Sequence, residues 1–110
     1  KIVRGYSKAF FSGITSLELS KIIYNYFIKK NILQNKIINI GSRRTSKFTL
    51  LTKIRKIFKK NINIVRYQNF IIDRSLDSKK FRKLTRYKVV KWDKMLLELK
   101  RFMISNNYKF

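Results

Sequence analysis

Three stretches of the chain carry apolar residues at the three- and four-residue spacing of an amphipathic helix. This spacing predicts helices over residues 16–30, 46–59 and 92–103. Each helix has one apolar face to bury. The three faces are formed by Leu19, Ile22, Ile23, Tyr26 and Phe27; by Leu50, Leu51, Ile54, Ile57 and Phe58; and by Trp92, Met95, Leu96, Leu99, Phe102 and Met103.

Helix starts are marked by short polar side chains that can accept from free backbone amides. Thr15 and Glu18 form a capping box, in which each side chain is expected to bind the other residue's amide. Asp77 and Ser78 precede a short helix that is expected to stop near Tyr87. These signals divide the chain into four helical segments.

Short apolar runs between the helices are typical of strands. We predict strands over residues 2–6, 37–40 and 62–65, and a loop over residues 7–13 with two aromatic residues at its centre. The alternation of helix and strand predicts a small mixed α/β fold, with residues 1–110 forming a single lobe.

The net charge is the property of this sequence that differs most from an ordinary domain. Lysine and arginine number 28 against 5 acidic residues, which gives a formal charge of +23. Self-repulsion at this charge opposes compaction, and an acidic partner or a nucleic acid would relieve it. A coding sequence rich in A and T also accounts for abundant lysine, so two interpretations of the charge stay open.

Missing residue types exclude several kinds of site. The chain contains no cysteine and no histidine, which removes disulfides, thiolate metal sites and the usual neutral-pH base. Its glycines, Gly5, Gly13 and Gly41, are too scattered to form a dinucleotide-binding loop. No apolar run reaches the ~20 residues of a membrane span. We therefore expect no metal, no membrane contact and a cytoplasmic location, with an organelle as the alternative.

Several segments of the chain, taken in order, carry a family resemblance. They are residues 3–19, Ile38 to Ser42, Ser46 to Phe48, Asp73 to Ser78, and then Phe81, Leu84, Thr85, Tyr87 and Trp92. These segments resemble the C-terminal, substrate-binding part of extended short-chain dehydrogenases/reductases that act on nucleotide-sugars. Within this NAD-dependent epimerase/dehydratase superfamily, the dTDP-4-dehydrorhamnose reductases are the most similar group. The resemblance implies a substrate-side lobe without its Rossmann half, and NAD(P)H as the cofactor of the full-length family only.

The resemblance implies which residues face the substrate. Arg74 is the main candidate for a phosphate or sugar contact, since its planar fork suits an anion; an ion pair with Asp73 or Asp77 is the alternative. Ser75, Tyr6 and Thr15 would lie on the same side. In the family architecture Phe10, Phe11 and Ile14 would contact the Rossmann half or another protein partner.

The superfamily's catalytic Tyr-x-x-x-Lys pattern occurs twice, at Tyr26–Lys30 and Tyr87–Lys91. Neither is expected to be catalytic, because the first tyrosine lies on an apolar stripe and the second in a loop. The chain also departs from the family pattern: Arg86 replaces a glycine, Thr49 replaces an acid in a first helical turn, and Val89 and Val90 replace prolines. These departures favour a lobe without catalytic residues of its own.

A second hypothesis is a basic module of the same ancestry that binds RNA within a ribonucleoprotein. It rests on charge, because backbone phosphates attract lysine and arginine without any sequence motif. The residues expected to carry such binding are Lys53, Lys56, Lys59, Lys60, Lys79, Lys80, Arg82 and Lys83.

Overall fold

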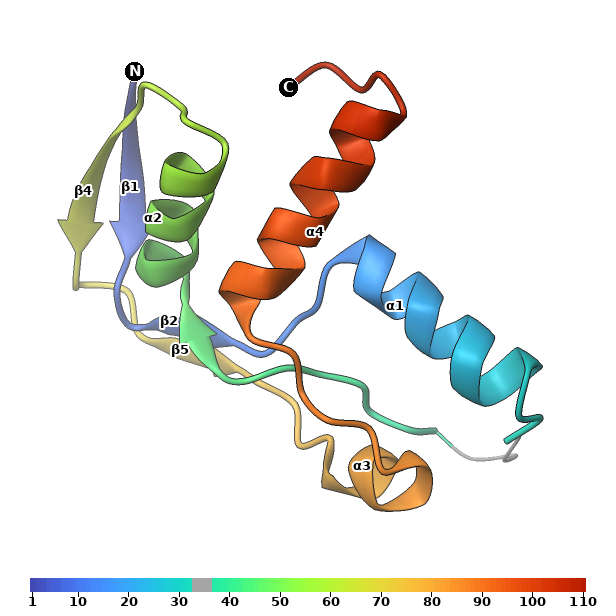
Figure 1. The fold of residues 1–110 in the computed structure, drawn as a ribbon. Coiled ribbons are helices and arrows are strands. Elements are labelled where there is room, and N and C mark those ends of the chain that lie inside the picture. The colour runs from blue at the N-terminus through green and yellow to red at the C-terminus, as the bar shows by residue number, and fades with distance from the viewer. Residues whose placement is uncertain (33–36) are drawn as a thin grey trace.

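The computed structural model describes residues 1–32 and 37–110, which form two small sheets and a set of helices (Figure 1). The mixed α/β lobe predicted from the sequence is confirmed. Its elements are β1 (Ile2–Tyr6), β2 (Ala9–Phe11), α1 (Ser16–Ile22), a π-helix (Ile23–Ile28), β3 (Thr45–Ser46), α2 (Lys47–Ile57), β4 (Asn63–Tyr67), β5 (Ile72–Arg74), α3 (Lys79–Thr85) and α4 (Trp92–Ser105).

The first sheet is a parallel pair, β1 and β4, in a register that aligns Ile2 with Asn63 and Tyr6 with Tyr67. Helix α2 packs against it, as Figure 1 shows on the left of the molecule. Gly5 permits this close approach, because a Cβ atom there would lie 2.6 Å from Cδ2 of Phe48. A glycine is therefore required where the helix meets the strand.

In the second sheet β2 is the central strand, antiparallel to β3 and parallel to β5. The prediction of a loop over residues 7–13 was wrong for Ala9 to Phe11. A three-residue strand carries no readable alternation, and its neighbours come from residues 45–46 and 72–74. Only these distant partners make the segment a strand.

The strand predicted over residues 37–40 is not formed. Among the described residues, no strand pairs with this segment, and the chain is anchored just after it instead. The Ser42 amide donates to Ser12 O at 2.7 Å, and the Ser42 hydroxyl donates to Gly13 O at 2.6 Å. Gly41 allows this contact, because a Cβ atom there would lie 2.8 Å from Ser12 O.

The most buried apolar side chains lie on α1, α3 and α4: Ile22, Phe81, Met95 and Leu96. Phe81 is 0% exposed, and its ring meets those of Tyr26, Phe27 and Tyr87 at centroid distances of 6.0, 6.3 and 5.5 Å. The helix predicted over residues 16–30 ends its α-helical part at Ile22 and continues as a π-helix. The wider turn brings Tyr26 and Phe27 onto Phe81.

The capping box at α1 is half formed. The Glu18 amide donates to Thr15 Oγ1 at 3.2 Å, as predicted, but the Glu18 carboxylate accepts from the Tyr87 hydroxyl at 2.6 Å instead of binding back to Thr15. Burial, and then the bond to Glu18, raise the pKa of Tyr87 above its usual range. Glu18 therefore joins α1 to the segment that follows α3.

The starts of α2 and α3 are held differently, and Ser78, the N-cap of α3, makes no side-chain cap hydrogen bond. Ser46 caps α2 by accepting from the Thr49 amide at 3.1 Å, so the loss of an acid at position 49 removes no cap. Before α3, the Lys79 amide donates to the Asp77 carboxylate at 2.9 Å. Helix α3 ends at Arg86, which has a φ of 58°. This left-handed conformation is the one that a glycine adopts without strain.

The lobe is flat and open. It measures 46 × 37 × 18 Å, and its radius of gyration is 15.8 Å, whereas a compact domain of this length has about 13 Å. Its accessible surface is 8234 Å², against roughly 6,500 Å² expected from its mass. Much surface that a closed domain would bury is thus left accessible.

Candidate functional site

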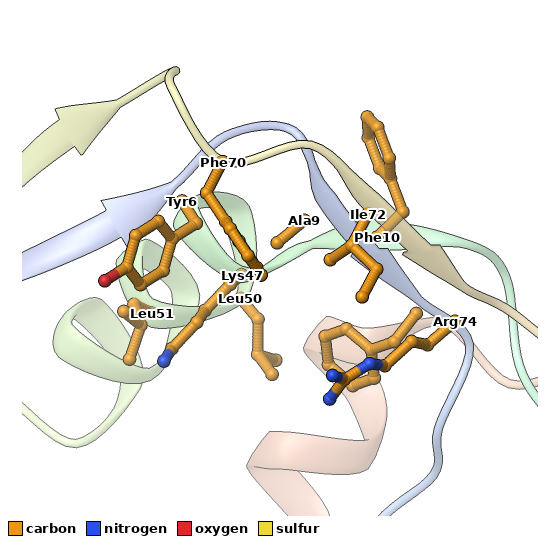
Figure 2. Close-up of a pocket in the computed structure, with 10 residues that line it drawn as sticks. Tyr6, Ala9, Phe10, Lys47, Leu50, Leu51, Phe70, Ile72 and Arg74 are labelled. Carbon is orange, nitrogen blue, oxygen red and sulfur yellow. The ribbon is translucent and has the colours of Figure 1, made fainter.

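A cavity of about 380 Å³ lies between β2, β5 and the start of α2 (Figure 2). Most of its wall is apolar, formed by side chains that the two sheets and the helix direct toward one another. Its lining consists of Tyr6, Ala9, Phe10, Phe11, Lys47, Leu50, Leu51, Phe70, Ile72 and Arg74. Such an enclosure of apolar side chains with a few polar groups is typical of a small-molecule site.

The two ends of the cavity carry positive charge. Figure 2 shows Tyr6, Phe70 and Lys47 at one end and Arg74 at the other. The Lys47 ammonium lies 5.1 Å from the centroid of the Tyr6 ring. No carboxylate lines the cavity, so this site suits a ligand with an apolar or aromatic body and negative charge.

Arg74 does not form the ion pair that was its alternative role. Asp73 instead accepts from Arg44 Nε at 3.1 Å and from the Ser75 hydroxyl at 2.6 Å. Hydrogen bonds from Ser75, helped by the Arg44 charge, hold the pKa of Asp73 below its ordinary value. Among the described residues, no carboxylate pairs with the exposed Arg74, whose guanidinium is thus available to an anion.

The other residues predicted to face a substrate divide into two groups. Tyr6 lines the cavity with Arg74. Thr15 and Ser75 do not line it: Thr15 is a buried cap of α1, and the Ser75 hydroxyl donates to Asp73. Their contacts position the ends of neighbouring elements, α1 in one case and the turn after β5 in the other.

The cavity is also lined by residues that were not predicted from the sequence to face a ligand. Lys47, Leu50, Phe70 and Ile72 come from α2 and from the segment around β5. Leu50 and Leu51 were predicted on the apolar stripe of their helix, which indicated burial but not a cavity. No local pattern joins Phe70 to Tyr6, since their contact depends on the pairing of β1 with β4.

The aromatic residues expected at an interface are partly covered within the lobe. Phe10, Phe11 and Ile14 are all half-buried. The Arg44 guanidinium lies 3.7 Å from the Phe10 ring centroid, and the Phe11 ring lies 5.8 Å from that of Trp92. Contact of these three residues with a partner stays a prediction.

The lysines and arginines predicted to bind RNA lie on two separate elements. One group lies on α2 and the turn after it, and the other on α3, at a distance from the first (Figure 1). Lys53 pairs with Asp93 at 2.6 Å. The predicted residues therefore do not form one continuous stripe.

Neither Tyr-x-x-x-Lys match has the geometry of a reactive pair in this structure. The Lys30 ammonium lies over the Tyr26 ring, 5.1 Å from its centroid, and the Tyr87 hydroxyl is bound to Glu18. Within residues 1–32 and 37–110, no three acidic side chains are grouped to hold a metal ion. No helix in the same ranges has the length and apolar character needed to cross a membrane.

No protein-family profile and no curated protein matches the chain. Solved structures do match. A GDP-6-OMe-4-keto-L-xylo-heptose reductase from C. jejuni aligns over 96% of this chain and 34% of its own, with a TM-score of 0.61 and 18% identity. The GDP-mannoheptose C4 reductase from Campylobacter jejuni, with NADP bound, aligns over 94% and 32%, with a TM-score of 0.57 and 16% identity.

A third similar structure is UDP-glucuronic acid 4-epimerase from Bacillus cereus in complex with NAD. It aligns over 87% of this chain and 30% of its own, with a TM-score of 0.56 and 19% identity. The chain has the fold of one third of these enzymes. The predicted fold, a small mixed α/β lobe that corresponds to part of a longer chain of this kind, is thereby confirmed.

Proposed function

We propose that this chain is the substrate-side lobe of a reductase- or epimerase-like protein that binds a nucleotide-sugar together with a Rossmann half. The observation that carries the proposal is the shared fold: three enzymes named for GDP- or UDP-linked sugars match nearly the whole lobe. The finer assignment to the dTDP-4-dehydrorhamnose reductases rests on the sequence resemblance. NAD(P)H would bind to the Rossmann half, since the chain lacks a glycine-rich turn for the pyrophosphate.

The cavity supports this proposal through its chemistry. A nucleotide-sugar combines an aromatic base, apolar sugar faces and a pyrophosphate. Tyr6 and Phe70 offer ring surface, while Arg74 and Lys47 offer positive charge at the two ends. Arg74 would contact the phosphate or the sugar, and Tyr6 would pack against the ligand.

The open shape supports the need for a second body. The accessible surface exceeds the expectation for a compact domain by about 1,700 Å². This excess is comparable to one side of a permanent interface, in which both partners together bury roughly 2,000–5,000 Å². A Rossmann half would cover part of it, and Phe10, Phe11 and Ile14 are the residues proposed to contact that half.

The proposal is tested by titrating the ¹⁵N-labelled chain with UDP-glucose and with GDP-mannose, using inorganic pyrophosphate for comparison. We expect a weak complex, roughly millimolar, because one lobe supplies only part of the site. Amide shifts should centre on Tyr6, Lys47 and Arg74. The variant Arg74→Gln should weaken binding, while Arg101→Gln, which removes the same charge from α4, should not.

Two results would contradict this proposal. Shifts spread evenly over the lysines of α2 and α3 would indicate general attraction of anions. Equal effects of Arg74→Gln and Arg101→Gln would exclude Arg74 from the site.

A further inference from the structure

In the part of the chain that the structure describes, no helix covers one side of the β1–β4 sheet. On the side where Gly5 lies, Phe48 of α2 fills the space. Residues of opposite parity point the other way, and there Ile2 is 72% and Val65 46% exposed, with Arg4 and Asn63 exposed beside them. The sheet therefore presents a bare surface to its surroundings.

Three aromatic rings meet where the two strands of this sheet end. The Tyr6 ring packs edgewise against Tyr67 at 5.4 Å and against Phe70 at 5.5 Å between centroids. They line a cavity of about 300 Å³ together with Arg4 and Asn69. Edge-to-face packing fixes these rings but, unlike a stack, leaves ring faces open to another planar group.

Positive charge surrounds the rings, and no acid opposes it. The Arg4 guanidinium lies 5.2 Å from the Tyr67 centroid, and the Lys47 ammonium lies 5.1 Å from that of Tyr6. No aspartate or glutamate occurs in the sequence between Glu18 and Asp73. None of the ion pairs in the described part of the chain involves Arg4 or Lys47.

We propose that the bare face of the β1–β4 sheet, with its Tyr6–Tyr67–Phe70 cluster, binds single-stranded nucleic acid. Bases stack on the fixed rings, and phosphates contact Arg4 beside them. The combination of open rings with unopposed cations favours this ligand over an apolar protein surface, which would leave the cations desolvated without partners. Unpaired strands suit it better than duplexes, because their bases are free to stack.

This site is distinct from the lysines and arginines of α2 and α3. Those residues supply charge without rings, whereas here aromatic residues carry the contact with the bases. Binding of nucleic acid should therefore depend on the presence of the aromatic side chains as well as on the salt concentration. Binding of a polyanion without bases should depend on the charge alone.

The test measures anisotropy of a labelled oligouridine of about 12 nucleotides, a length in the range of single-strand sites, with inorganic polyphosphate as the ligand that lacks bases. Tyr67→Ala should weaken oligouridine binding about 5–150-fold, as expected for losing one stacked base. It should leave polyphosphate binding unchanged. Tyr67→Phe should retain oligouridine affinity.

The matched control is Tyr24→Ala on the π-helix, where the side chain is 57% exposed and lies outside the cluster. It should not alter binding. Arg4→Gln should lower the slope of log affinity against log salt by about 0.7 for oligouridine. An oligouridine affinity that Tyr67→Ala leaves unchanged would overturn the proposal.

A second measurement does not depend on the folding of any variant. Amide shifts of the unaltered ¹⁵N-labelled chain with oligouridine should centre on Arg4, Tyr6, Val65 and Tyr67. Shifts confined to the lysines of α2 and α3, or full displacement by polyphosphate at equal charge, would show an electrostatic complex only and would refute the assignment of this face.

Discussion

The helical side of the lobe and the β1–β4 side differ in how far their side chains are buried and paired within the chain. Around Phe81, rings from the π-helix and from the segment after α3 close on one another, and the carboxylate of Glu18 accepts from Tyr87. Around the parallel strands, one face is filled by α2 and the other is left bare. The first region is completed within the chain, whereas the second retains surface for a ligand or partner.

The largest expected effect lies in the closed region. Phe81→Ala should reduce the free energy of unfolding by about 3–5 kcal/mol, because a fully buried ring leaves a cavity. Urea denaturation followed by circular dichroism measures this loss. Tyr24→Ala is the control, and its exposed ring should cost much less. Equal losses for the two variants would mean that the cluster around Phe81 is not the core.

The two faces of the β1–β4 sheet should respond unequally to small substitutions. Gly5→Ala places a methyl group 2.6 Å from Phe48 and 2.9 Å from Ile64, so it should cost about 1–3 kcal/mol. Val65→Thr, on the bare face, should change stability by about 0.5 kcal/mol or less. Thermal melting of both variants checks this contrast. A tolerated Gly5→Ala would show that α2 does not pack tightly on the strand.

The hydrogen bond between Glu18 and Tyr87 can be removed by deleting one atom, the hydroxyl oxygen of Tyr87. Tyr87→Phe should cost about 1–3 kcal/mol near neutral pH, because it leaves the Glu18 carboxylate without its hydroxyl donor. Denaturant titrations of the two proteins measure the difference.

The pH dependence of this difference has a defined sign. The pKa of Tyr87 is raised in the folded state, so the bond contributes fully below the unfolded value of about 10 and is lost as pH rises above it. The advantage of the natural chain over Tyr87→Phe should therefore shrink above about pH 10. An advantage that grows there would contradict the bond.

The smallest expected effect is a gain in the stability of the lobe. Arg86 has a φ of 58° at the end of α3, so Arg86→Gly should stabilise the lobe by about 1 kcal/mol. Lys83→Gly, within the same helix and also exposed, should instead destabilise it by about 1 kcal/mol. Melting temperatures of the two variants should move in opposite directions. A loss of stability in Arg86→Gly would show that the arginine side chain makes a contact worth more than the strain.

The sequence predicts elements well where the signal is local. Thr15 caps its helix as expected, and α4 follows the predicted stripe from Trp92. The predictions failed for Ala9 to Phe11 and for residues 37–40, because a strand is defined by partners distant in the sequence. The π-helix was also missed, since its apolar spacing resembles that of an α-helix over so few residues.

The candidate site shows the same limit. Arg74 and Tyr6 were identified through a family resemblance, and both line the cavity. Phe70 and Lys47 could not be identified from the sequence, because a ring in a connecting segment and one lysine among many carry no distinguishing local pattern. The ion pair of Arg44 with Asp73, in the place considered for Arg74, could not be read from the sequence either.

The parallel pairing of β1 with β4 also affects the order of events during synthesis. Ile2 lies beside Asn63, so the first strand has no partner until the ribosome has made some 61 further residues. At 5–20 residues per second this takes roughly 3–12 s. During that time β1 lacks its β4 neighbour, and α1, which is completed long before, has no α3 or α4 to pack against. The parallel pair and the helical core can therefore close only after the second half of this lobe has been made.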